Sequence, residues 1–119
     1  RKREIFHFYK DALSSIKEIT FLEECDFSFS NYWLTTILIN EDSTIDREKL
    51  RLHLEKDNIE TRPLWKPMHL QPVFLDCESY VNGVSEDLFN RGICLPSGTS
   101  MNDIDLNRVV IKIKQLYEV

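Results

Sequence analysis

The segment Arg62–Pro72, with the sequence RPLWKPMHLQP, combines a stiff backbone with side chains that suit ligand binding. It holds three of the chain's four prolines. Each proline fixes its own φ angle and restricts the preceding residue to extended geometry, so the segment is stiff before any ligand arrives. A stiff segment loses little conformational freedom on binding, which lowers the cost of forming a complex.

Four side chains of this segment are candidate ligand contacts: Arg62, Trp65, Lys66 and His69. An arginine fork suits a phosphate or a carboxylate, and a lysine adds positive charge. A tryptophan offers a flat face to a base, a sugar or a cofactor ring. A neutral histidine can hydrogen-bond to a sugar hydroxyl or a phosphate. Together they predict a site for an anionic ligand that contains rings, such as a nucleotide sugar.

Structural roles for the same residues stay open. The tryptophan could pack in a core or an interface, the histidine could make a structural hydrogen bond, and the two cations could be solvated. The acidic residues at 23, 24 and 26 could form a carboxylate cluster or a solvated turn. The SGTS segment at 97–100 could bind an anion or only cap the helix that follows.

Composition excludes several classes of protein. The net charge is −5 and no basic stripe is present, which argues against a nucleic-acid partner. The longest apolar run is too short to span a bilayer, so no membrane partner is expected. Cys25, Cys77 and Cys94 form no CxxC pair, so neither a metal site nor a disulfide framework is predicted. Free thiols in a reducing cytoplasm are the simplest interpretation.

The elements that must hold the loop can be predicted from hydrophobic periodicity. Helices are expected over 1–16, from the 41–46 turn to about Asp57, over 85–91 with Ser85 as cap, and after a cap at Ser100 or Asn102. Strands are expected over 19–23, 32–40, 59–65 and 93–96, with 32–40 as the central strand. Residues 66–83 are expected to be irregular. This order predicts one α+β domain over 1–119, with two layers and a short, mainly antiparallel sheet covered by helices.

Two stretches carry a family resemblance: NIETRPLWKPMHLQPVF and SEDLFNRGICLPSGTSMNDIDLNRVV. With NYWLTTIL at 31–38, they closely resemble the C-terminal region of the DegT/DnrJ/EryC1/StrS family of pyridoxal-phosphate-dependent aminotransferases, which act on nucleotide-linked sugars. The resemblance implies the small C-terminal domain of a type I aminotransferase fold. The chain begins with no initiator methionine, so we expect a fragment of a longer protein whose large cofactor-binding domain is absent.

The resemblance also implies an activity for the whole enzyme. An amino group passes from an amino-acid donor, usually glutamate, to a keto sugar linked to a nucleotide, with pyridoxal 5′-phosphate as cofactor in a homodimer. No lysine here lies in the family's Schiff-base context, so no catalytic residue is assigned and the fragment alone is expected to be inactive. Arg62, Trp65, Lys66 and His69 are expected on the substrate side. Second-rank contacts are Asn31, Tyr32 and Trp33.

Two other classes of function compete with this interpretation. A small α+β domain can be a non-catalytic module that senses a small molecule, or a structural module that dimerises. The resemblance favours the aminotransferase.

Overall fold

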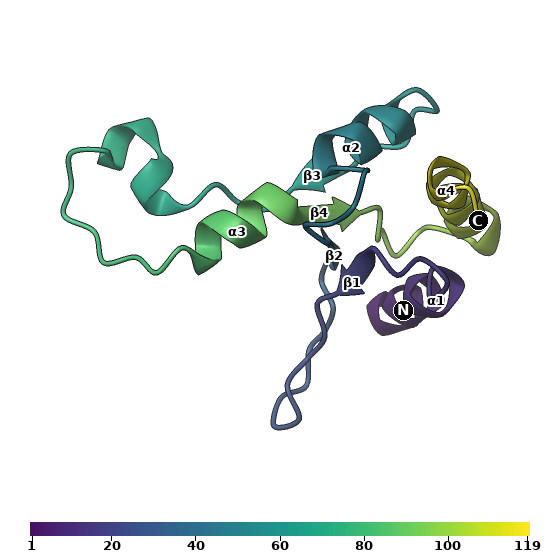
Figure 1. Cartoon of the computed structure of the whole chain (residues 1–119). Coiled ribbons are helices and arrows are strands. Elements are labelled where there is room, and N and C mark those ends of the chain that lie inside the picture. The colour runs from purple at the N-terminus through teal and green to yellow at the C-terminus, as the bar shows by residue number, and fades with distance from the viewer.

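Helices and strands form two layers in the computed structural model, which describes all 119 residues (Figure 1). In chain order the elements are α1 (Lys2–Ala12), β1 (Ile19–Phe21), β2 (Thr35–Ile39), α2 (Arg47–Glu55), β3 (Arg62–Pro63), two short 3-10 helices (Met68–Leu70 and Pro72–Phe74), α3 (Val84–Arg91), β4 (Gly92–Leu95) and α4 (Asp103–Tyr117). The sheet has the order β1-β2-β4-β3, and every pair is antiparallel. The predicted α+β domain is confirmed.

The core lies between one face of the sheet and three helices. Side chains alternate between the two faces of a strand, so the paired residues Ile37 and Ile93 face the core together. The apolar stripes of α1, α2 and α4 cover this face, and α1 and α2 each contact α4. The helical residues of this core are Ile5, Tyr9, Leu50, Leu54, Leu106, Val109, Val110 and Ile113. No helix of the structure combines the length and the apolar character that crossing a membrane requires.

Two of the residues predicted to begin or end a helix do so in the structure, Asn102 and Asn58. Asn102 begins α4 with a capping box, in which its side chain accepts a hydrogen bond from the Asp105 N–H and the Asp105 carboxylate accepts one from the Asn102 N–H. Asn58 follows α2 with a left-handed φ of 55°, as a helix stop should. The predicted Ser85 cap is wrong, because Gly83 at φ 85° precedes the first residue of α3.

Three predicted elements are shorter than expected by four or five residues, and the strand predicted over 19–23 ends at Phe21. The helix predicted over 1–16 ends at Ala12, and the buried Leu13 and Ile16 pack from the turns that follow. The strand predicted over 32–40 begins only at Thr35, because Tyr32 has a left-handed φ of 43° that breaks extended geometry. The strand predicted over 59–65 is reduced to two residues, and its Pro63 has no N–H to donate.

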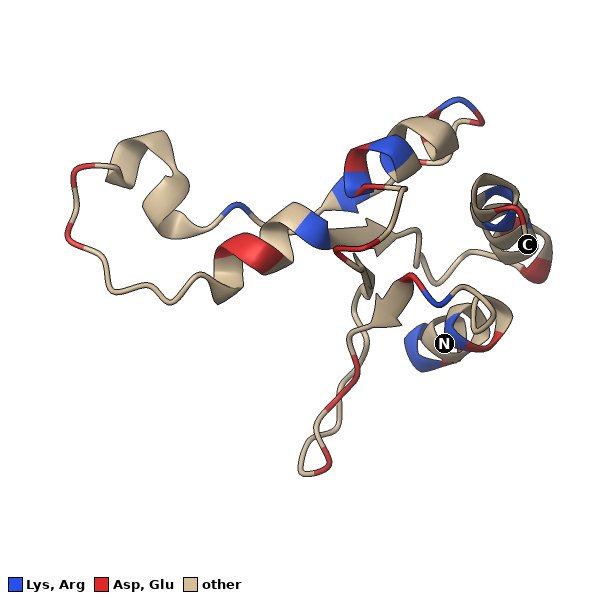
Figure 2. Cartoon of the chain, in the orientation of Figure 1, with Lys and Arg blue, Asp and Glu red and all other residues tan.

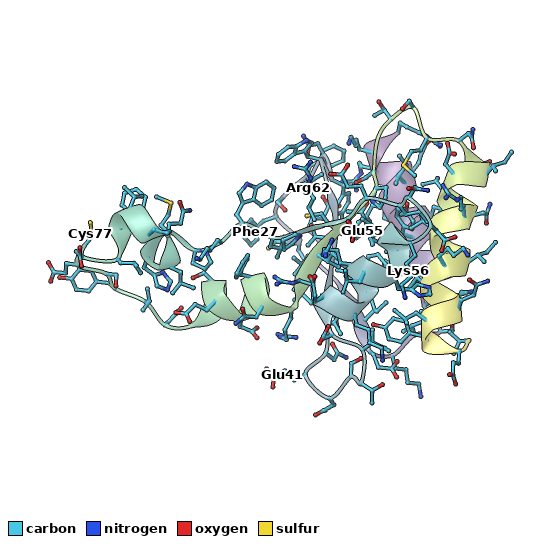
Figure 3. The ribbon with its side chains drawn as sticks, turned by 90° about the horizontal axis from the view of Figure 1, so that it is seen from above. Phe27, Glu41, Glu55, Lys56, Arg62 and Cys77 are labelled. Atoms are coloured by element: carbon cyan, nitrogen blue, oxygen red, sulfur yellow. The ribbon has the colours of Figure 1, made fainter.

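Two segments project away from this body (Figure 1). We call residues 22–34 the hairpin and residues 64–83 the arm. Figure 2 shows that the arm carries few charges, and Figure 3 places Cys77 at its far end. Most exposed large apolar side chains lie on these projections: Leu22, Phe27, Phe29, Trp33, Trp65, Met68, Val73, Leu75, Tyr80 and Val81.

The neck of the hairpin is held by Arg3, the second residue of α1. Its guanidinium donates two hydrogen bonds to the Glu24 carboxylate, at 2.7 and 2.9 Å, and one to the Ser30 carbonyl. It also lies 4.3 Å above the Phe29 ring and 5.0 Å from that of Tyr32. The bonds from Arg3 and from the Ser30 N–H lower the pKa of Glu24 to about 2. Glu24 is therefore an anchor, and no carboxylate cluster forms with its neighbours.

We predict a pH-dependent contribution from this anchor. The folded-state pKa of Glu24 lies below its ordinary value of 4.5, so the contribution is present above that value and is lost as pH falls toward about 2. Glu24→Gln should therefore lower the Tm at about pH 6, and the difference from wild type should shrink at about pH 2.5. Glu23→Gln, which breaks only the exposed pair with Lys10, is the control and should have a smaller effect at about pH 6. An equal Tm difference at both pH values would contradict the assignment.

The base of the arm packs directly on β4 at Gly92. A Cβ at this position would lie 2.5 Å from the carbonyl oxygen of Leu88 and would overlap the Leu64 side chain. Gly92→Ala should therefore lower the free energy of unfolding by about 1–3 kcal/mol, measured by denaturant titration. Gly98→Ala is the matched control, because its nearest neighbours would be 3.8 and 3.9 Å away. Equal stability of the two variants would contradict the close packing of Leu64 and Leu88 around Gly92.

Candidate functional site

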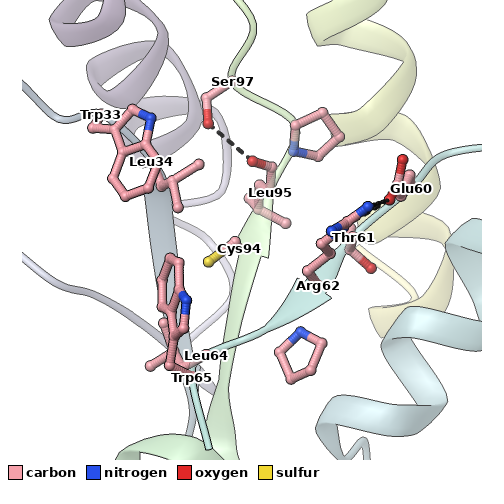
Figure 4. Close-up of a pocket in the computed structure, with 12 residues that line it drawn as sticks. Trp33, Leu34, Glu60, Thr61, Arg62, Leu64, Trp65, Cys94, Leu95 and Ser97 are labelled. Atoms are coloured by element: carbon pink, nitrogen blue, oxygen red, sulfur yellow. Dashed lines mark hydrogen bonds and ion pairs between the residues drawn. The ribbon is translucent and has the colours of Figure 1, made fainter.

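A pocket of about 550 Å³ lies where the hairpin returns to the sheet and the arm leaves it (Figure 4). Pairing registers place Thr36, Cys94 and Arg62 in one row across β2, β4 and β3. This row lies on the sheet face opposite the helical core. Cys94 and Arg62 line the pocket, and the Thr36 hydroxyl is 3.9 Å from the Cys94 sulfur. The sheet face that the helices leave uncovered therefore forms the floor of the pocket.

The only two tryptophans of the chain meet on one side of the pocket. Trp33 comes from the end of the hairpin and Trp65 from the start of the arm, and their ring centroids are 5.9 Å apart with a tilt of 33°. Their side chains remain 61% and 66% exposed. A broad, accessible aromatic wall of this kind can stack a ring of a ligand.

Arg62 supplies the positive charge on the other side of the pocket (Figure 4). Its side chain is 79% exposed and forms an ion pair with Glu60, with N–O distances of 2.7 and 2.8 Å. An exposed pair of this kind is weak, so a phosphate or carboxylate can compete with Glu60 for the guanidinium. The pocket therefore combines an apolar wall with one exchangeable site for an anion.

Nucleophilic and metal chemistry are not built into this chain's pocket. Burial raises the pKa of the Cys94 thiol, although the contact with Thr36 offsets part of this, so the thiol is protonated at neutral pH. The lining contains no histidine to activate a nucleophile and no lysine to form a Schiff base. No group of three His, Cys, Asp or Glu side chains is placed to hold a metal ion.

The structure separates the other loop candidates from Arg62 and Trp65. Lys66 follows Trp65 but does not line the pocket, and its ammonium forms no ion pair. His69 lies in the arm with a side chain only 16% exposed, and its Nε2 is 2.7 Å from the carboxylate of Glu86 in α3. His69 therefore makes a structural hydrogen bond, one of the two roles considered from the sequence, and this bond connects the arm to α3.

Of the three candidates on the hairpin, only Trp33 lines the pocket, and Asn31 and Tyr32 do not. Trp33 lines the pocket, and the Asn31 side chain accepts a hydrogen bond from its N–H. Tyr32 is only 6% exposed, and its ring stacks on Phe6 with centroids 3.7 Å apart. The structure thus brings Arg62, Trp65 and Trp33 together, with Asn31 behind Trp33 and Tyr32 turned into the domain.

Sequence reasoning missed the side chains that hold this wall in place. Lys2 donates to the carbonyls of Trp33 and Ser97, at 2.9 and 2.5 Å, and Arg3 holds the hairpin neck. Ser97 donates to the Leu95 carbonyl and accepts from the Thr35 N–H. Apart from Ser97 and Leu95, these partners are far apart in sequence, so no local pattern could have identified them.

Comparisons with known proteins agree with this architecture. Two relatives each match 98% of this chain: EpsN of Bacillus subtilis, which is named as a pyridoxal phosphate-dependent aminotransferase and is 40% identical, and GDP-perosamine synthase of Escherichia coli O157:H7, which is 36% identical. The chain spans 31% of the length of each relative.

Solved aminotransferases share the fold. DesV of S. venezuelae superposes with a TM-score of 0.85 at 21% identity, covering all of this chain and 32% of that one. TlmJ of Streptoalloteichus hindustanus gives 0.84 at 20% identity, covering 98% and 31%. A family model matches residues 1–114. The chain therefore belongs to the DegT/DnrJ/EryC1/StrS aminotransferase family.

Proposed function

We propose that this chain is the substrate-side small domain of a pyridoxal-phosphate-dependent aminotransferase that acts on a nucleotide-linked keto sugar. The observation that carries the proposal is the pocket that joins Arg62 to the tryptophan wall in a chain of this family. The E. coli relative is named for a GDP-linked product. Family membership is the reason to prefer this function over a sensing or purely structural module.

In the proposed complex, each group in the pocket has a distinct role. The Arg62 guanidinium leaves Glu60 and donates charge-assisted hydrogen bonds to the diphosphate. Trp33 and Trp65 exclude water from one side and stack against a ring of the substrate. Lys66 adds positive charge at the rim. Asn31 holds Trp33, while Tyr32 and His69 fix the hairpin and the arm.

We propose that the cofactor is held by the part of the polypeptide outside this chain. Pyridoxal 5′-phosphate, when bound, carries the amino group between the donor, which we propose to be glutamate, and the keto sugar. The pocket described here does not fit that group by itself, because its lining has no lysine to form a Schiff base with it. The isolated domain should accordingly have no transaminase activity.

The exposed apolar side chains of the two projections support the further proposal of a homodimer. Exposed apolar residues such as Phe27 and Tyr80 are typical of surfaces that a partner covers. In the full-length enzyme these surfaces would contact the large domain or the second subunit.

Arg62→Ala in the full-length enzyme tests the anion role. With a nucleotide-linked keto sugar and glutamate as substrates, kcat/KM should fall by roughly 10- to 150-fold, because one charge-assisted hydrogen bond is lost. Glu60→Gln removes the competing carboxylate and should raise kcat/KM by up to about fivefold.

Arg51→Ala is the matched control for this experiment. Arg51 is also paired with glutamates, at Glu48 and Glu55, but it does not line the pocket. Its loss should leave kcat/KM within about twofold of wild type. An Arg62→Ala enzyme with wild-type kcat/KM would remove Arg62 from the site.

A further inference from the structure

The wall of the pocket depends on a backbone turn in an unfavourable conformation. Tyr32 has a φ of 43°, which is rare for a bulky residue and costs free energy unless its surroundings hold it. The next residue is Trp33, whose ring forms the wall. The conformation of this turn therefore sets where the Trp33 indole lies relative to Trp65.

Helix α1 supplies the contacts that hold the turn. The Tyr32 ring stacks on Phe6 with an interplanar angle of 8°, and its hydroxyl accepts a hydrogen bond from the Glu24 N–H. The Asn31 side chain accepts the Trp33 N–H, and the Lys2 ammonium donates to the Trp33 carbonyl at 2.9 Å. Both backbone polar groups of Trp33 are thus fixed by side chains outside any strand ladder.

The same ammonium also reaches a second segment of the pocket lining. Lys2 Nζ donates to the Ser97 carbonyl at 2.5 Å, and Ser97 lines the pocket where the chain leaves β4. The neighbouring Pro96 carbonyl accepts a hydrogen bond from the buried Tyr9 hydroxyl of α1, at 2.9 Å. Burial, assisted by the charge of Asp105, raises the pKa of Tyr9, so this hydroxyl stays protonated as a donor.

We propose that Lys2 is a positioning residue that joins the Trp33 and Ser97 segments of the pocket lining and so sets the geometry of the aromatic wall. One cation on α1 donates to two carbonyls, 31 and 95 residues away in sequence, and so fixes the distance between these two segments. Lys2 does not line the pocket, so it acts on the ligand only through Trp33 and Ser97. The identity of the ligand in this inference rests on the proposed function. The positioning of Trp33 and Ser97 by Lys2 does not.

The test uses the full-length enzyme with 5-fluorotryptophan in place of tryptophan. The resonances of Trp33 and Trp65 are assigned by their absence in Trp33→Phe and Trp65→Phe. Lys2→Met keeps a side chain of similar length without the ammonium. It should shift or broaden these two resonances and leave other tryptophan resonances unchanged. It should also raise the KM for the nucleotide sugar roughly 3- to 10-fold, with kcat within about twofold.

Two further variants separate positioning from general stability. Lys2→Arg keeps a cationic donor and should restore both the resonances and KM toward wild type. Lys10→Met removes a lysine of the same helix that pairs only with Glu23 on the surface, and it should change neither. If Lys2→Met is too unstable to isolate, the Lys2→Gln variant takes its place. Its neutral amide can replace only part of the hydrogen bonding that the ammonium makes to the Trp33 and Ser97 carbonyls.

The possible results separate this inference from the proposed function. Unchanged Trp33 and Trp65 resonances in Lys2→Met would overturn the positioning role. Equal shifts of all tryptophan resonances, or equal effects of Lys10→Met, would also overturn it. Shifted Trp33 and Trp65 resonances with an unchanged KM would uphold the role of Lys2 and overturn the nucleotide sugar as the ligand of this pocket.

Discussion

The antiparallel register between β2 and β4 is the constraint on which both the core and the pocket depend. It pairs Ile37 with Ile93 on the face that the helices cover, and Thr36 with Cys94 on the other face. Because side chains alternate, a slip of one residue would exchange the two sets and bury polar groups in the core. Hydrophobic burial on one face therefore determines which side chains line the pocket on the other.

From the sequence, the α+β class and the apolar stripes of the helices could be predicted, because they follow from local periodicity. Element ends were predicted well only where a side chain acts on its own neighbours, as Asn102 does on Asp105. The strand start at Thr35 was not predicted, because the turn at Tyr32 is held by Phe6 and Lys2 from another element. No local propensity encodes such a contact.

The candidate site was likewise predicted in part, where its residues are close in sequence, and missed where they come from distant elements. The proline-rich segment does carry Arg62 and Trp65 to a pocket, and the structure adds Trp33 beside them. His69 belongs to the same motif, yet it lies against Glu86 because the chain turns through two 3-10 helices after Trp65. Sequence proximity within a motif therefore does not ensure that its side chains meet in one site. The basic residues of α1 gave no signal in the sequence, since their acceptors include backbone carbonyls.

The arm leaves the sheet from β3 and returns to it through α3 at β4, and these two strands are neighbours. An excursion that starts and ends at adjacent strands can change in length without altering the pairing that flanks it. Doubling such a loop costs only about 0.6 kcal/mol in closure entropy. The length of this segment can therefore change between related chains while the sheet beneath it keeps its pairing.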